Sequence, residues 1–123
     1  MAITIPRGTT YTMGYQHTHN GTNYPLTGAT VYFTVKSTEF DDTMPDTAAL
    51  IRKDITSHTD PTNGYTIIAL SPQDTEYQYG GTVPIEPGDY VCDIKVKEST
   101  GAVYKVYETT FSITGSPTNR SGL

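Results

Sequence analysis

The sequence is poor in several of the residues that mark common protein classes. Its 123 residues include no tryptophan, three phenylalanines and one cysteine, Cys92. A single cysteine cannot form an internal disulfide, so a disulfide scaffold is excluded. The helix formers Ala, Leu and Glu are sparse, and no apolar run approaches the length of a membrane-spanning helix. A helical bundle and a helical membrane protein are therefore not expected.

Basic residues are also few. Eight Lys and Arg stand against thirteen Asp and Glu, which gives a formal net charge of −5. The basic residues are scattered among carboxylates and form no cluster. Proteins that bind nucleic acid or anionic lipid through phosphate groups need a basic face. The sequence therefore predicts neither nucleic acid nor membrane as a partner.

The abundant residues favour β structure, and residues 88–97 show it best. Ten tyrosines, with many Thr and Gly, suit pleated and half-buried surfaces. Cys92, Ile94 and Val96 share one parity of this stretch, which is the period of a strand with one buried face. A Gly-containing loop at 98–101 then leads to β-rich runs at 103–107 and 111–113, so an antiparallel hairpin is predicted. Cys92 is expected to be a small buried hydrophobe rather than a reactive thiol.

Further extended runs punctuated by turns indicate the fold class. We expect strands within 3–5, 10–15, 29–36, 49–55 and 65–70, and one helical turn that starts at Ser71 and crosses between sheets. Strands at this spacing are typical of a sandwich. The prediction is an all-β, Ig-like antiparallel β-sandwich of about seven to eight strands with one short helical turn. Residues 1–114 are expected to form one domain, and residues 115–123 a flexible C-terminal tail.

Two histidines have a spacing that can hold a metal ion. His17 and His19 lie two residues apart, so an extended backbone places both imidazoles on one side. No third ligand is identifiable from the sequence, because the remaining histidine, His58, falls in a different loop. The simpler interpretation is a solvated polar turn, and no metal ligand is predicted.

Other chemical signatures are weaker still. An acidic loop could gather Ca²⁺, but the Gly-bearing spacing of a calcium loop is missing from its carboxylates, Glu39, Asp41, Asp42 and Asp46. No nucleophile motif or phosphate-binding glycine loop occurs. The sequence predicts no enzyme, no catalytic residue and no cofactor.

Tyrosines near loops suggest a protein–protein surface. Tyrosine buries area while keeping a polar tip, which is why it is enriched at interfaces. Candidate partner-binding residues are five loop tyrosines and two polar residues of the tail: Tyr11, Tyr15, Tyr24, Tyr77, Tyr79, Asn119 and Arg120.

Six separated pieces of the chain, taken in order, carry a resemblance to a known family. They are IPRGTT (5–10), LTGATVYFTVK (26–36), LSPQDT (70–75), PGDYVCDI (87–94), GAVY (101–104) and TFSI (110–113). Together they resemble small β-sandwich virion proteins of tailed bacteriophages, in particular the N-terminal domain of baseplate upper proteins and its free-standing relatives. That family carries no catalytic residues to transfer.

The resemblance implies a function, a location and partners. It implies a structural component of a bacteriophage virion, such as a head, head–tail accessory or decoration protein, or a tail or baseplate attachment domain. The expected partners are other virion proteins, with the chain present as a homo-oligomer or in many copies. The expected location is the virion after synthesis in the host cytoplasm, since the N-terminus shows no signal-peptide pattern. The alternative is a carbohydrate- or cell-surface-binding module that uses loop tyrosines with Asp41, Asp42 and Asn63.

Overall fold

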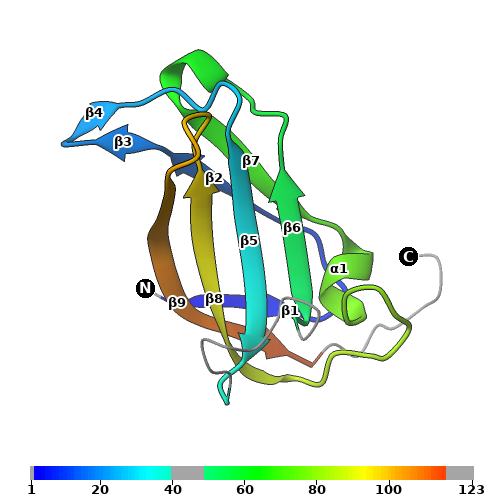
Figure 1. Cartoon of the computed structure of the whole chain (residues 1–123). Helices are drawn as coiled ribbons and strands as arrows, with labels where there is room; N and C mark the ends of the chain where they lie inside the picture. Colours follow the sequence, from blue (N-terminus) through cyan, green and yellow to red (C-terminus); the bar gives the residue numbers. More distant parts are fainter. Residues whose placement is uncertain (1, 40–48, 116–123) are drawn as a thin grey trace.

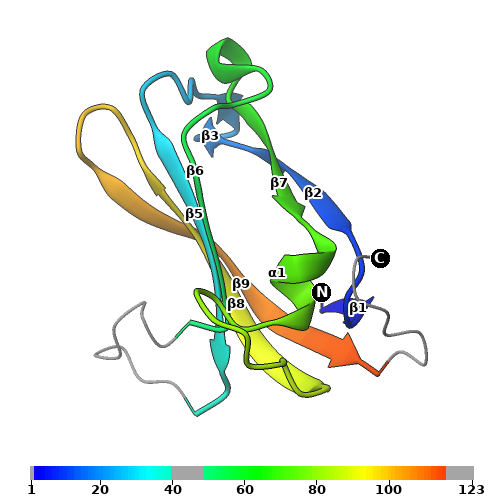
Figure 2. The same ribbon diagram turned by 90° about the vertical axis from the view of Figure 1, so that its right-hand side faces the viewer.

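Two β layers face each other in the computed structural model of the chain, which describes residues 2–39 and 49–115 (Figures 1 and 2). The first layer is a five-stranded sheet with the order β1-β9-β8-β5-β6, and the second is the pair β2-β7. A small hairpin, β3-β4, extends from the second layer. The strands of the first layer are β1 (Ile3–Pro6), β5 (Thr30–Ser37), β6 (Ile51–Ile55), β8 (Gly88–Lys97) and β9 (Val103–Thr114). The predicted all-β sandwich is confirmed.

Alternating burial sets the centre of the first layer. Along β5, Val31, Phe33 and Val35 are fully buried, while the residues between them are only partly covered. β8 lies antiparallel beside β5, with Phe33 opposite Ile94. β8 and β9 form the predicted antiparallel hairpin, and β9 is one continuous strand instead of two separate runs.

The first strand pairs with the last. β1 lies parallel to β9, from Ile3 opposite Phe111 to Pro6 opposite Thr114. This pair departs from the expected antiparallel arrangement. The strand order places β1 at an edge of the sheet. An edge suits Pro6, because proline has no N–H to donate to a neighbouring strand.

The second layer carries an unexpected hairpin. β2 (Tyr11–Gln16) and β7 (Tyr65–Leu70) pair antiparallel over six positions. Residues 17–23, expected to be a polar turn, contain β3 (Thr18–His19) and β4 (Thr22–Asn23). Asn20 and Gly21 join these strands with φ angles of 52° and 79°. Positive φ at both positions is the requirement of a tight type I′ hairpin turn.

A short helix crosses between the layers at the opposite end from the β3-β4 hairpin (Figure 2). Helix α1 (Pro72–Glu76) begins at Ser71, whose side chain accepts a hydrogen bond from the backbone N–H of Asp74. Asp74 in turn accepts from the backbone of Ser71, which completes a capping box. Asp74 also pairs with Lys53 of β6 at 2.8 Å. The predicted helical turn is confirmed. A second short turn, the 3-10 helix η2 (Pro61–Asn63), precedes β7.

The hydrophobic core fills the space between the layers. Cys92 belongs to it, as predicted, and burial raises the pKa of its thiol to about 11. A thiol that stays protonated is a poor nucleophile. The buried cluster comprises Ile3, Ile5, Leu26, Ala29, Val31, Phe33, Val35, Ile51, Ile68, Leu70, Ile85, Cys92, Ile94, Val96, Phe111 and Ile113.

Parts of two sequence-based expectations lie outside the described residues. The acidic loop is described only as far as Glu39, and the tail only at Gly115. The domain boundary after residue 114 therefore stays a prediction. Within residues 2–39 and 49–115, no helix has the length and apolar character that crossing a membrane requires.

Gly64 allows two backbone segments to approach, and a matched pair of substitutions tests this. Its φ is +76°, and an added Cβ would overlap the carbonyl oxygens of Tyr24 and His17. Gly21 has a similar φ of +79° but nothing within 4 Å. A left-handed conformation costs a side chain about 1–2 kcal/mol at either position. Gly64→Ala should therefore lower the free energy of unfolding, measured in denaturant, well beyond Gly21→Ala. Equal losses would contradict this packing.

Candidate functional site

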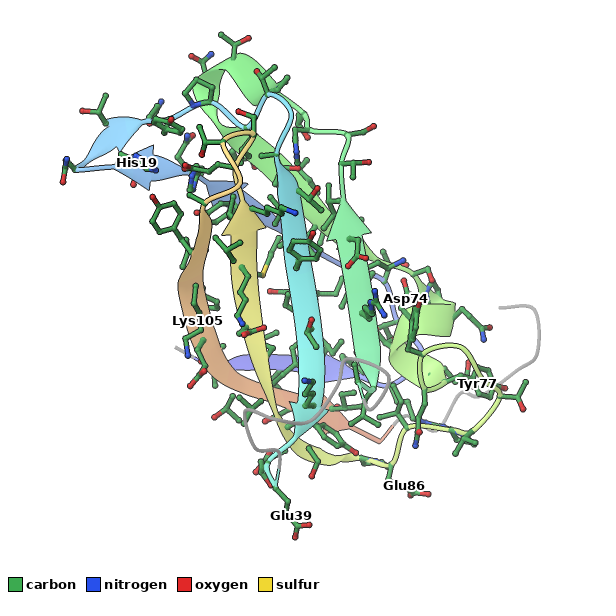
Figure 3. The ribbon with its side chains drawn as sticks, viewed as in Figure 1. His19, Glu39, Asp74, Tyr77, Glu86 and Lys105 are labelled. Atoms are coloured by element: carbon green, nitrogen blue, oxygen red, sulfur yellow. The ribbon has the colours of Figure 1, made fainter. Side chains whose placement is uncertain are left out.

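Three ionisable side chains from distant parts of the sequence converge at one end of the sandwich. Oε2 of Glu98 lies 2.7 Å from Nε2 of His17 and 2.6 Å from Nε2 of His19. One possible ligand atom from each residue lies within 4.8 Å of the others, which is a geometry that can hold a metal ion. Figure 3 labels His19 on the β3-β4 hairpin, at the far end of the molecule from Tyr77. The three residues are called the His-Glu-His cluster below.

The two histidines are placed by the end of β2 and the start of the hairpin. His17 directly follows β2, and its backbone N–H donates to the carbonyl of Gly64 at 2.8 Å. The carbonyl of His17 accepts from the N–H of Tyr24 at 3.0 Å, which fixes the returning chain. Extended backbone between His17 and His19 keeps both rings on one side, as their spacing predicted. Their ring centroids lie 5.3 Å apart.

Glu98 arrives from the other layer. It follows the end of β8, and its N–H donates to the carbonyl of Ala102 at 2.8 Å. The N–H of Gly101, at a φ of +93°, donates back to the carbonyl of Glu98. The turn that closes the β8-β9 hairpin therefore holds the carboxylate at a defined position. The sequence indicated this turn but not the direction in which Glu98 points.

The cluster is largely removed from solvent. The side chains of His17 and Glu98 are 2% and 4% exposed, and that of His19 is 34% exposed. Burial alone would raise the pKa of Glu98, but hydrogen bonds from His17 and His19, with the charges of both rings, lower it. The group is therefore a carboxylate that accepts from two imidazoles. Such charge-assisted hydrogen bonds are stronger than neutral ones.

Tyr15 holds the buried imidazole from its other side. Its hydroxyl lies 2.8 Å from Nδ1 of His17, and the two side chains come from the same face of one extended segment. Burial, together with the negative charge of Glu98, raises the pKa of Tyr15 to about 12. A neutral phenol can either donate or accept a hydrogen bond, so Tyr15 is compatible with both tautomers of His17.

Aromatic rings surround His19. Tyr24 stacks on it with a centroid distance of 3.8 Å and an interplanar angle of 11°. Tyr104 of β9 meets His19 edge-on at 5.6 Å. Tyr24 also contacts His17 edge-on at 5.9 Å. Tyr24 and Tyr104 therefore pack on His19, whose side chain stays 34% exposed.

The structure separates the tyrosines proposed as partner-binding residues. Tyr15 and Tyr24 contact the His-Glu-His cluster. Tyr11 packs edge-on against Phe111 beside the core. Tyr77 and Tyr79 follow α1 at the other end of the molecule, where Tyr79 lies under the guanidinium of Arg52. The other two candidates, Asn119 and Arg120, lie outside the described residues.

The remaining histidine does not join the cluster. His58 contacts Oγ1 of Thr66 at 3.0 Å through Nδ1, and its Nε2 donates to the carbonyl of Ala29 at 2.8 Å. Both of its nitrogens are thus used in tying a loop to the sheet. The ligand that sequence reasoning missed is Glu98, which stands 79 residues after His19. Only the pairing of strand ends across the two layers could have indicated it.

Comparisons with known proteins give similarity of fold alone. No protein-family description matches the chain, and no curated protein sequence matches it. The soluble domain of PmoD from Methylocystis sp. ATCC 49242 (Rockwell) is 8% identical with a TM-score of 0.49, over 91% of this chain and 76% of that one. CopC from Methylosinus trichosporium OB3b is 9% identical with a TM-score of 0.47, over 97% and 89%. At these levels the likeness does not extend to ligands or residues.

The resemblance to bacteriophage virion proteins is wrong. The solved structures found to be similar are PmoD and CopC rather than virion components. The predictions that depended on this resemblance are therefore wrong as well: the virion function, the virion location, and the virion partners with many-copy assembly. The physical reason is that the six matched pieces consist of strand and turn residues, which any β-sandwich needs.

The carbohydrate-binding alternative is not supported either. Of its residues, Asn63 is engaged in holding the turn before β7, where its side chain donates to Asp60 at 2.9 Å. The backbone carbonyl of Asn63 accepts from Gln16 at 2.6 Å. Asp41 and Asp42 lie outside the described residues.

Replacement of Glu98 tests how much the cluster contributes to stability. Glu98→Gln removes the negative charge to which both imidazoles hydrogen-bond. We therefore expect the free energy of unfolding at neutral pH to fall by about 1–3 kcal/mol. A carboxyl whose pKa is lowered by folding contributes stability above its unfolded pKa and loses it as the pH falls through the folded value. The difference between variant and wild type should therefore shrink in acid.

Glu86→Gln is the matched control for this measurement. Glu86 is exposed and lies at the opposite end of the molecule from His19 (Figure 3). Denaturant unfolding at neutral pH and in acid should show little change in the free energy of unfolding of this variant. A loss in Glu98→Gln that persists unchanged in acid would contradict a role for the carboxylate charge.

Proposed function

We propose that this chain binds a divalent late first-row transition-metal ion, of the Zn²⁺ or Cu²⁺ type, through His17, His19 and Glu98. The observation that carries the proposal is the convergence of two imidazole nitrogens and one carboxylate oxygen within 4.8 Å. Imidazole and carboxylate together suit these ions, whereas Mg²⁺ and Ca²⁺ prefer oxygen ligands alone. In this proposal the chain holds the ion and does not act as an enzyme.

A small rearrangement would convert the hydrogen-bonded cluster into a metal site. Ligands about 2.0–2.2 Å from a tetrahedral ion lie about 3.3–3.6 Å from one another. The present separations of 2.7 and 2.6 Å therefore have to widen as the ion replaces the shared protons. His19 is partly exposed and sits on a two-residue strand, so it is the ligand that moves most easily.

The surroundings of His17 match those of a metal-ligating histidine. Such histidines donate their second ring N–H to a nearby oxygen, which fixes the tautomer and the ring orientation. The hydroxyl of Tyr15, at 2.8 Å from Nδ1 of His17, can accept that proton. Nε2 of His17 is then free of its proton and directed toward the ion. Tyr15 is therefore a positioning residue in this proposal.

The same three side chains could instead serve without metal as a clamp, that is, a set of hydrogen bonds that joins the two layers. A buried carboxylate has to be paired, and the two imidazoles pair it. The clamp and the metal site differ in what an added ion does. If the cluster is only a clamp, an added ion does not stabilise the folded protein. If it is a metal site, the free energy of binding adds to the stability of the folded protein.

Direct binding measurements distinguish the two. Titration of metal-free protein with Zn²⁺ or Cu²⁺ in a calorimeter should show one ion bound per chain. His19→Ala removes one ligand and should weaken the affinity at least about tenfold. His58→Gln replaces a histidine outside the cluster and should leave the affinity within about twofold. Absence of saturable binding, or equal affinity in the His19 and His58 variants, would refute the proposal.

Thermal unfolding gives an independent test. A ligand of the folded state at a free concentration of 100 times its Kd stabilises by about 2.7 kcal/mol, which corresponds to a rise in Tm of roughly 10 °C for a domain of this size. The ion should produce this rise in wild type and in His58→Gln but not in His19→Ala, and a chelator should reverse it. Mg²⁺ should have no effect. The same shift in the His19 variant would place the bound ion elsewhere.

A further inference from the structure

The exposures of the three ligands define an open side of the site. His17 and Glu98 are 2% and 4% exposed, so an ion between them is closed off from solvent in their directions. His19 is 34% exposed and is the ligand that meets solvent. Among the described residues, the cluster offers three ligand atoms to an ion that commonly takes four. A fourth position would therefore open beside His19.

The surface around that position is aromatic and apolar. Tyr104 is 44% exposed and stands edge-on to His19, and its neighbour Val103 is 55% exposed. Both belong to the start of β9, where β1 does not extend, because β1 pairs only with residues 111–114. A flat ring that approached the ion past His19 would lie against Tyr104. Contact between two aromatic rings contributes more binding free energy than the buried area alone would give.

We propose that the metal-loaded site takes a fourth ligand from outside the chain, and that this ligand is an imidazole-type nitrogen whose ring packs on Tyr104. The inference rests on the proposed metal binding. Free imidazole and a histidine side chain of another protein share this chemistry. The bond formed is a dative bond from the ring nitrogen to the ion, which displaces water and transfers no electrons. The site is thus built for a ternary complex in which the ion joins this chain to a second ligand.

Charge and shape favour a neutral ring over a small anion. With one carboxylate, a divalent ion in this cluster retains a single positive charge, which an anion would neutralise, whereas a neutral ring binds through its nitrogen lone pair and leaves that charge in place. The chain as a whole carries a formal charge of −5, which repels anions. An anion such as azide also has no ring to place against Tyr104. Imidazole should therefore bind more tightly than azide, and its affinity alone should depend on Tyr104.

The test is a titration of the Cu²⁺-loaded protein with ¹⁵N-labelled imidazole, followed by electron paramagnetic resonance. Coupling of the labelled nitrogen to the copper is expected, with the ion retained by the protein after gel filtration. Tyr104→Ala should lower the imidazole affinity about three- to tenfold when both proteins are compared at saturating Cu²⁺. Azide affinity should be the same in wild type and in this variant.

Tyr79→Ala is the matched control, because Tyr79 is 52% exposed and follows α1 at the other end of the sandwich. It should leave the imidazole affinity unchanged. Bound Cu²⁺ without coupling to the added nitrogen would overturn the open position while leaving the proposed function intact. An imidazole affinity that is equal in Tyr104→Ala and wild type would overturn the role of Tyr104. A protein that binds no Cu²⁺ would refute the proposed function itself.

Discussion

The architecture depends on how a nearly buried carboxylate is neutralised. Glu98 is 4% exposed and has two imidazoles against a single oxygen. Removing a charge from water costs several kcal/mol, and only well-placed partners offset that cost. The partners come from the other layer of the sandwich. The turn after β8 and the chain after β2 are therefore held in one relative position.

The pleat of the strands supplies the positions that this pairing needs. An extended segment puts Tyr15, His17 and His19 on one side at two-residue intervals, so one face delivers a phenol and two imidazoles in a row. Gly64 lets the chain around His17 approach β7, and the tight turn at Asn20 and Gly21 brings Tyr24 back over His19. No buried side-chain nitrogen or oxygen in the described residues lacks a hydrogen-bond partner. The polar cluster is thus integrated into an otherwise apolar sandwich.

Local patterns predicted the strands well and the site only in part. Alternation along residues 88–97 and 29–36 located β8 and β5, because the strand period is visible within a few residues. The spacing of His17 and His19 placed two rings on one side. The contact with Glu98 depends on how the ends of two different sheets meet, which no local pattern contains. For the same reason the loop tyrosines looked alike in sequence, whereas in the structure Tyr15 and Tyr24 lie at the cluster and Tyr77 and Tyr79 at the opposite end.

The pairing of β1 with β9 joins residues near the two ends of the described chain. Ile3 and Ile5 belong to the core, yet β9, the strand beside which they lie, is synthesised after every other strand of the described residues. Until residues 111–114 have been synthesised, these two isoleucines have no sheet to complete. Contacts of such long sequence separation slow folding, because a long loop must close before they contribute. The nascent chain therefore exposes an apolar strand until β9 has been synthesised.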